Sequence, residues 1–121
     1  VYAHIAEIIP PMLKQMKEAG YGFPVLMYED FTKYEYTDEE GEAARAKWNT
    51  ILDSIIQAFE IENGISNGDL LDLGTRPTKK QKEFGKEHCE KFDMKLLTNK
   101  DRQVRKEGWK NFQLYFHNLW D

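Results

Sequence analysis

The chain has 121 residues, of which 40% are hydrophobic and 31% are charged, and its formal net charge is −4. This length is enough for one hydrophobic core, and the composition is typical of a folded domain rather than a disordered segment. No run approaches the roughly 18 apolar residues of a membrane span, and no signal-peptide pattern opens the sequence. We therefore expect one soluble helical domain over residues 1–121.

Two features of the sequence concern the compartment in which the protein acts and the processing of its N-terminus. Its single cysteine, Cys89, excludes an internal disulfide and is compatible with a reducing compartment. Its first residue is Val1 rather than methionine, which indicates a trimmed product whose missing N-terminal piece could hold functional residues.

Charge is distributed unevenly along the chain. Residues 28–42 contain Lys33 and seven acids, namely Glu29, Asp30, Glu35, Asp38, Glu39, Glu40 and Glu42. Residues 76–110 contain twelve basic and six acidic residues. Such runs indicate solvated or mutually complementary surfaces in most proteins, and the alternative is a basic face that meets an anionic ligand. The overall acidity disfavours non-specific nucleic-acid binding.

Residues 2–19 have the apolar periodicity of a first helix, carried by Ile5, Ile8, Ile9, Met12, Leu13 and Met16. Pro10 and Pro11 predict a kink or a break in it, because proline has no backbone donor and crowds the preceding turn. Gly20 supplies the C-cap. The aromatic but aperiodic residues 21–36 predict an ordered loop across the helices, with room for a short extended segment.

A capping box of Thr37 and Glu40 predicts the start of a second helix that runs to Glu62. Its apolar stripe is the most regular in the chain and consists of Trp48, Ile51, Leu52, Ile55, Ile56 and Phe59. Asn63 and Gly64 are expected to end it. Residues 69–75 then form a loop whose leucines, Leu70, Leu71 and Leu73, cover one edge of the core.

A second capping box, Thr78 with Gln81, predicts a polar third helix. Residues 98–101 are interpreted as a break with a new N-cap, and the alternative is one long helix over residues 78–119. The last helix carries an aromatic stripe of Trp109, Phe112, Tyr115, Phe116 and Leu119, and we expect the rest of the chain to pack around it. The predicted fold is all-α, a compact bundle of about four helices with residues 48–59 facing residues 109–119.

The sequence lacks the patterns of catalytic and metal sites. His88 and Cys89 adjoin without a second pair of ligands, so a half-buried structural cysteine is the preferred interpretation. His4 and Glu7 resemble half of a carboxylate-bridged metal motif in reversed order, and the remaining ligands are missing. His117 is interpreted as a rim residue. We find no phosphate loop and no nucleophile motif, and we expect no metal, no cofactor and no enzyme activity.

The aromatic loop is the best candidate for a binding site. Its rings, which include Tyr21, Phe23 and Tyr34, are expected to pack on the helices or, alternatively, to form a contact surface for a protein. Near the cations Arg76, Lys79 and Lys80, the same rings could stack a nucleotide while the cations hold its phosphates. The candidate ligand- or partner-binding residues are therefore Tyr21, Phe23, Tyr34, Arg76, Lys79 and Lys80.

Two stretches of the chain resemble small bacteriophage-encoded proteins of uncharacterised function. One is the Trp-led helix of residues 48–60, and the other is the closing helix of residues 107–121, which reads EGWKNFQLYFHNLWD. The Ile-Ile-Pro-Pro run of residues 8–11 and the turn at residues 20–24 are also similar. Trp109 stands where such proteins commonly have leucine. The resemblance implies a shared fold and the cytoplasm of an infected bacterium, and it carries no catalytic residues.

Two functions are compatible with these observations. The preferred hypothesis is a non-enzymatic phage accessory protein that binds a host or phage protein through the aromatic loop and a helix face. The alternative is a small-molecule sequestering protein that traps a nucleotide signal used in host defence. This alternative predicts a homo-oligomer, and it predicts that Tyr21, Arg76 and Lys79 converge on one cavity.

Overall fold

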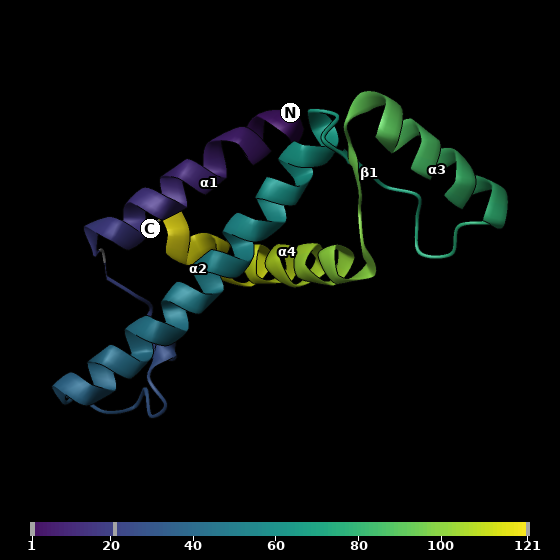
Figure 1. Cartoon of the computed structure of the whole chain (residues 1–121). Coiled ribbons are helices and arrows are strands. Elements are labelled where there is room, and N and C mark those ends of the chain that lie inside the picture. Colours follow the sequence, from purple (N-terminus) through teal and green to yellow (C-terminus); the bar gives the residue numbers. More distant parts are fainter. Residues whose placement is uncertain (1, 21, 121) are drawn as a thin grey trace.

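The structure of the protein is a computed structural model that describes the backbone of residues 2–20 and 22–120 and the side chains of residues 5–20 and 22–119. Within these residues the elements are, in chain order, α1 (Tyr2–Ala19), the 3-10 helix η1 (Val25–Met27), α2 (Asp38–Ser66), β1 (Leu70–Leu71), α3 (Lys79–Phe92), β2 (Lys95–Leu96) and α4 (Asn99–Trp120) (Figure 1). The predicted all-α bundle of four helices is confirmed.

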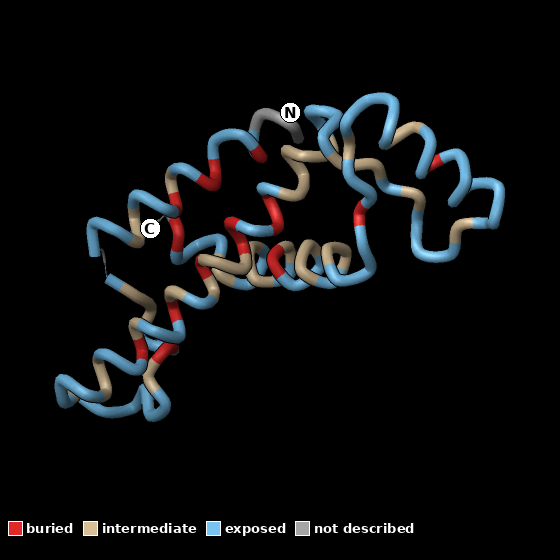
Figure 2. Tube along the Cα trace, in the orientation of Figure 1, coloured by how far each residue is buried: buried red, intermediate tan, exposed pale blue. Residues whose placement is uncertain are grey.

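Helix α2, and not α4, is the element on which the other helices pack. Both α1 and α4 lie against it, and the buried residues follow α2 where these helices meet it, whereas α3 is almost entirely exposed (Figure 2). The reason is the width of its apolar stripe, which buries side chains toward both neighbours: Trp48, Leu52, Ile55, Ile56 and Phe59. The expectation that the chain packs around the last helix is therefore wrong.

The predicted contact between α2 and α4 is confirmed in detail. The ring of Phe59 lies 4.9 Å from that of Trp109 and 5.0 Å from that of Phe112, measured between centroids. Gly108 sits at the crossing point, where a Cβ atom would collide with the Ser54 carbonyl and the Ala58 side chain. The two helices can approach this closely because Gly108 has no side chain.

Helix α1 continues through Pro10 and Pro11, so a break at this point is wrong. Pro10 cannot donate to the carbonyl of Ala6, as a residue four positions later normally does. The side-chain amide of Asn63 donates to that carbonyl instead, at 2.5 Å. Asn63 therefore does not end α2 as expected. It lies within the helix, which continues to Ser66 rather than ending at Glu62.

Fewer of the periodic apolar residues of α1 are buried than the sequence predicts. Ile9 and Leu13 are in the core, and Met12 and Met16 pack against it. Ile5 and Ile8 are 39% and 46% exposed, which places them on the outer side of the helix. The predicted C-cap is confirmed, because Gly20 has a φ angle of 68° and its amide donates to the carbonyl of Lys17.

The segment from residue 22 to residue 36 is an ordered loop, as predicted, and it contains η1 rather than an extended segment. Met27 is buried, and the rings of Tyr28 and Tyr36 stack with their centroids 3.6 Å apart. Phe31 and Tyr34 point away from the core and are exposed. The loop leads into the predicted capping box of Thr37, which begins α2.

Strands β1 and β2 pair in parallel and are connected by α3. These three elements form a small lobe beyond the C-terminal end of α2 (Figure 1). The amides of Lys95 and Leu97 donate to the carbonyls of Asp69 and Leu71. The loop predicted over residues 69–75 therefore begins with a strand. The break before the last helix is confirmed, because Thr98 and Asp101 form a reciprocal cap.

Candidate functional site

The structure does not bring the predicted binding residues together. Phe23 lies in the loop beside the N-terminal half of α2, and Tyr34 is fully exposed in the same loop. Arg76, Lys79 and Lys80 are exposed at the start of α3, at the other end of α2 (Figure 1). Tyr21 lies outside the described residues. The convergence that a nucleotide site at these residues requires is therefore absent among the described members of the set.

The loop rings divide into a packed group and an exposed group. Phe23 is half-buried, with its centroid 5.3 Å from that of Tyr28 and the Arg45 guanidinium 5.2 Å above its ring. Phe31 is 53% exposed, and the side chain of Tyr34 is fully exposed. Packing therefore accounts for Phe23, and a contact surface remains open for Phe31 and Tyr34.

A different cluster of aromatic side chains stands on the outer side of α3. Phe84, His88 and Phe92 occur at steps of four, so they occupy one side of this helix. Their rings lie in a row, with centroid distances of 5.4 Å and 4.6 Å. Phe84 is 60% exposed and Phe92 is 56% exposed, so these rings contribute little to the core.

Two lysines border this row of rings. The ammonium of Lys91 lies 5.3 Å from the ring centroid of Phe92. Lys80 is exposed one turn before Phe84. We call the surface made by Lys80, Phe84, His88, Lys91 and Phe92 the α3 face.

A contact at Gly85, on the side of α3 next to this row of rings, holds the helix in place. Gly85 is its one buried residue among those described, and the side chains of Leu73 and Leu96 pack against it. A Cβ atom at this position would lie 2.7 Å from Leu73. The helix is therefore fixed through a glycine and two leucines, and the rings are left free to face outward.

Beside this contact lies a groove of about 510 Å³, which we call the strand-end groove. It is bordered by the segments that follow β1 and β2 and by the N-terminus of α4. Its apolar lining includes Leu73, Pro77, Leu96 and Leu97, and its cations are Lys82, Lys86 and Arg102. Ligands of parallel sheets commonly bind at the carboxyl ends of the strands, which is the position of this groove.

Arg102 is already engaged in a network behind the strand-end groove. Its guanidinium donates to the Asp72 carboxylate at 2.8 Å and 3.2 Å and to the side-chain oxygen of Asn99. The hydrogen bonds from Arg102 and from the backbone amide of Gly74, together with the charge of Arg105, lower the pKa of Asp72. This network fixes the loop after β1 to α4. The other two cations that line the groove are Lys82 and Lys86.

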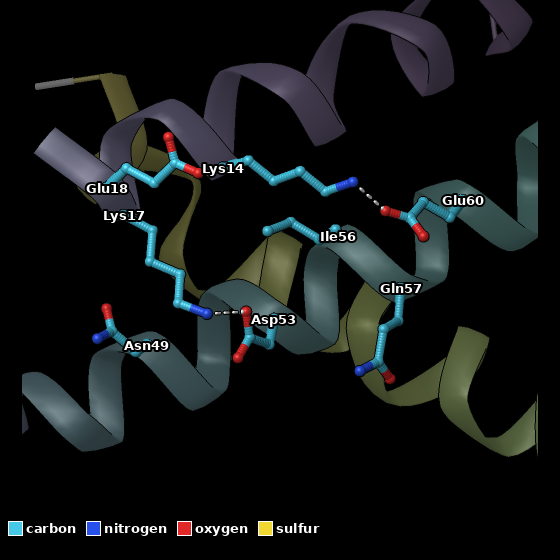
Figure 3. A pocket seen from close by; sticks show the side chains of 8 residues that line it. All are labelled: Lys14, Lys17, Glu18, Asn49, Asp53, Ile56, Gln57 and Glu60. Carbon is cyan, nitrogen blue, oxygen red and sulfur yellow. Dashed lines mark hydrogen bonds and ion pairs between the residues drawn. The ribbon is translucent and has the colours of Figure 1, made fainter.

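A second groove, of about 480 Å³, lies between α1 and α2 (Figure 3). Lys14 pairs with Glu60 and Lys17 pairs with Asp53, each at 2.7 Å, so both cations of this groove are paired, and Glu18 is a third acid in its lining. Such exposed pairs contribute about 0–1 kcal/mol each. We interpret this groove as part of the helix contact and not as a binding site.

The remaining candidates carry little chemistry. Cys89 is half-buried, and no group of three histidine, cysteine or acidic residues in the described chain could hold a metal ion. His117 is exposed on α4, and His4 lies outside the described side chains. None of the described helices has the length and apolarity needed to cross a membrane.

Comparisons with known proteins give no relative of this chain. No protein-family model matches it, and neither a curated protein nor a solved structure shows significant similarity to it.

Sequence reasoning did not identify the α3 face or the strand-end groove. The spacing of Phe84, His88 and Phe92 was a usable signal, because steps of four place three rings on one side of a helix that is otherwise polar. The groove had no such signal. Its residues come from three stretches of the chain, residues 73–77, residues 82–86 and residues 96–102, and the pairing of β1 with β2 brings the first and the last together.

Proposed function

We propose that this protein is a non-enzymatic phage accessory protein that binds a host or phage protein in the cytoplasm of the infected cell, and that the α3 face is its binding surface. The exposed row of Phe84, His88 and Phe92 is the observation that carries this proposal. Aromatic residues are enriched in the centres of protein interfaces and dominate their binding energy.

The position of the α3 face supports a role in binding rather than in folding. Helix α3 is attached through Gly85, whereas Phe84 and Phe92 remain 60% and 56% exposed. Exposed apolar surface of this kind favours binding to another protein, because the interface removes apolar area from water. Lys80 and Lys91 at its border favour a partner with an acidic, partly apolar segment.

The test is quantitative co-purification from a bacterial host, with and without phage infection. We compare the tagged chain with the variant Phe84→Ser/Phe92→Ser and with a control, Gln103→Ser/Gln113→Ser, whose positions are exposed on α4. We expect a defined protein to be enriched with the original chain and the control and to be lost with the Phe84→Ser/Phe92→Ser variant. A set of co-purified proteins that is the same for all three chains would contradict the proposal.

A second candidate function is the capture of an anionic small molecule, and the strand-end groove favours it. The groove combines four apolar side chains with the ammonium groups of Lys82 and Lys86, a lining that suits a ring system with a phosphate or carboxylate group. Its residues are not those predicted from the sequence, although Lys82 and Lys86 follow Lys79 and Lys80 on the same helix.

Native mass spectrometry of protein isolated without denaturation tests this second function. We expect a discrete extra mass of a few hundred daltons on the original chain, and its loss from the variant Lys82→Glu/Lys86→Glu. The control is Lys106→Glu/Lys110→Glu, which makes the same charge change on the exposed surface of α4. A clean polypeptide mass for the original chain from infected cells would contradict small-molecule capture.

A further inference from the structure

We propose that a second copy of this chain binds the α3 face, and that the copies associate head to tail. This inference rests on the proposed function, because it names a partner for the same surface. The partner surface is the exposed part of residues 25–42, which we call the acidic end. It consists of the apolar residues Val25, Leu26, Phe31 and Tyr34 and the acids Glu29, Glu35, Asp38, Glu39 and Glu42.

The acidic end has the chemistry that the α3 face requires. Val25, Leu26 and Phe31 are each more than half exposed, so the acidic end offers apolar area as well as charge. Lys33 is held by Glu40 at 2.7 Å, and this pair leaves the neighbouring acids in excess. The α3 face offers three aromatic rings between two lysines. The acidic end has an excess of acids, whereas on the α3 face Lys80 and Lys91 stand against one exposed acid, Glu87, which is one turn from both Phe84 and Lys91. The net charges of the two surfaces are therefore opposite in sign.

The two surfaces cannot meet within one molecule. The acidic end lies beside the first turns of α2, and the α3 face lies beyond its last turn (Figure 1). Helix α2 has 29 residues. At the ordinary rise per residue this corresponds to a separation of about 43 Å. Contact between them must therefore join different copies.

An interface between two unlike surfaces has a defined consequence for assembly. Two copies can make both contacts at once if they lie antiparallel about a two-fold axis. Otherwise each copy keeps one free surface after it binds a neighbour, and association continues until a larger ring closes or a linear chain forms. In every one of these arrangements an α3 face binds an acidic end, and no contact joins two α3 faces or two acidic ends. This difference allows a direct test by mixing two variants.

The test uses one variant for each surface, with substitutions at exposed positions. The acidic-end variant is Phe31→Ser/Glu35→Lys, and the α3-face variant is Lys80→Glu/Phe84→Ser. Circular dichroism first shows whether both variants keep the helical fold. Sedimentation equilibrium then gives the mass of the original chain, of each variant alone and of an equimolar mixture.

We expect the original chain to form species larger than 14.3 kDa as its concentration rises. Each variant alone should remain at 14.3 kDa, because it has lost one of the two surfaces. The mixture should form a species of twice that mass and no larger one, because one intact surface of each kind remains. The control Lys106→Glu/Lys110→Glu should assemble like the original chain.

Three results would overturn the inference. One is an original chain that stays at the mass of one copy up to about 1 mM, a concentration at which even weak specific association is detected. Another is an acidic-end variant that still forms dimers by itself, because such dimers do not need the acidic end. The third is a mixture that does not associate. Co-purification of a different protein that depends on Phe84 and Phe92 would, in each of these cases, leave the proposed function intact.

Discussion

Helices α3 and α4 both carry aromatic residues at helical spacing, and they use them in opposite ways. On α4, Trp109 and Phe112 pack against Phe59 of α2 within 5.0 Å between ring centroids. On α3, the ring of Phe84 stacks on His88 and the ring of Phe92 is tilted against it, and both phenylalanines remain more than half exposed. The spacing of the rings is therefore compatible with both outcomes, and their burial depends on what the rest of the chain places opposite.

Glycine marks the packed side of each of these helices. Gly108 faces α2, and the aromatic stripe of α4 lies close enough to that crossing to fill the space around it. Gly85 faces Leu73 and Leu96, and these leucines complete the contact without any ring of α3. The comparison indicates that the bundle depends on the α4 aromatics, whereas the α3 rings are available for binding.

Truncation of one ring in each region should give the largest difference. Phe59 is fully buried, so Phe59→Ala should lower the free energy of unfolding by about 3–5 kcal/mol. Phe84→Ala, at a position that is 60% exposed, should change it by less than about 0.5 kcal/mol. Urea denaturation of both variants measures the difference. Equal losses would show that α3 belongs to the same packed core.

The close approach at Gly108 gives the next prediction. Gly108→Ala should destabilise the protein by about 1–3 kcal/mol, because the new methyl group meets the Ser54 carbonyl and forces α4 away from α2. Gly41→Ala is the control, since its methyl group would meet only the Tyr28 hydroxyl at 4.0 Å. This control should be neutral or stabilising by up to about 1 kcal/mol. A stable Gly108→Ala variant would show that the helices are less tightly packed than described.

Loss of the hydrogen bond from Asn63 to the carbonyl of Ala6 should lower the free energy of unfolding by a similar amount. Asn63→Leu removes the donor to the buried carbonyl of Ala6 and should cost about 1–3 kcal/mol. Asn67→Leu, at an exposed position one turn later, should cost less than about 0.5 kcal/mol. Thermal denaturation distinguishes the two. Similar melting temperatures for both variants would argue against the role of Asn63.

The smallest expected effect concerns the ion network that attaches the strand-end loop to α4. The pKa of Asp72 is lowered by its hydrogen bonds to Arg102 and Gly74, so its contribution to stability is present above its unfolded pKa of about 3.9. That contribution is lost as the pH falls through the folded pKa. Asp72→Asn should therefore be less stable at pH 7 and should lose less stability than the original chain on acidification below about pH 4.

Arg102→Gln tests the cause of this pH dependence. It removes the first partner of Asp72 and should flatten the acid dependence in the same direction. Urea denaturation at a series of pH values measures it. An acid dependence identical in all three chains would assign the effect to other carboxyl groups.

Regular local signals in the sequence predicted most of the fold. The capping boxes at Thr37 and Thr78 and the stripe on α2 gave the correct starts and the correct central contact. The end of α2 was misplaced because Asn63 bonds to α1, which no local pattern reveals. Strands β1 and β2 were missed because two residues are too few to show alternation. The proposed site depends on this pairing and on the exposure of α3, and both are consequences of tertiary contacts.

Site-specific photocrosslinking inside cells is the most direct test of the claim that α3 presents a binding surface. A photoreactive phenylalanine derivative is incorporated at Phe84 and, as a control, at Gln103, which is exposed on α4. The account predicts a discrete crosslinked product from position 84 and none from position 103. A product of twice the chain mass would identify a second copy as the partner, and another mass would identify a different protein. Equal crosslinking from both positions, or none from position 84, would contradict it.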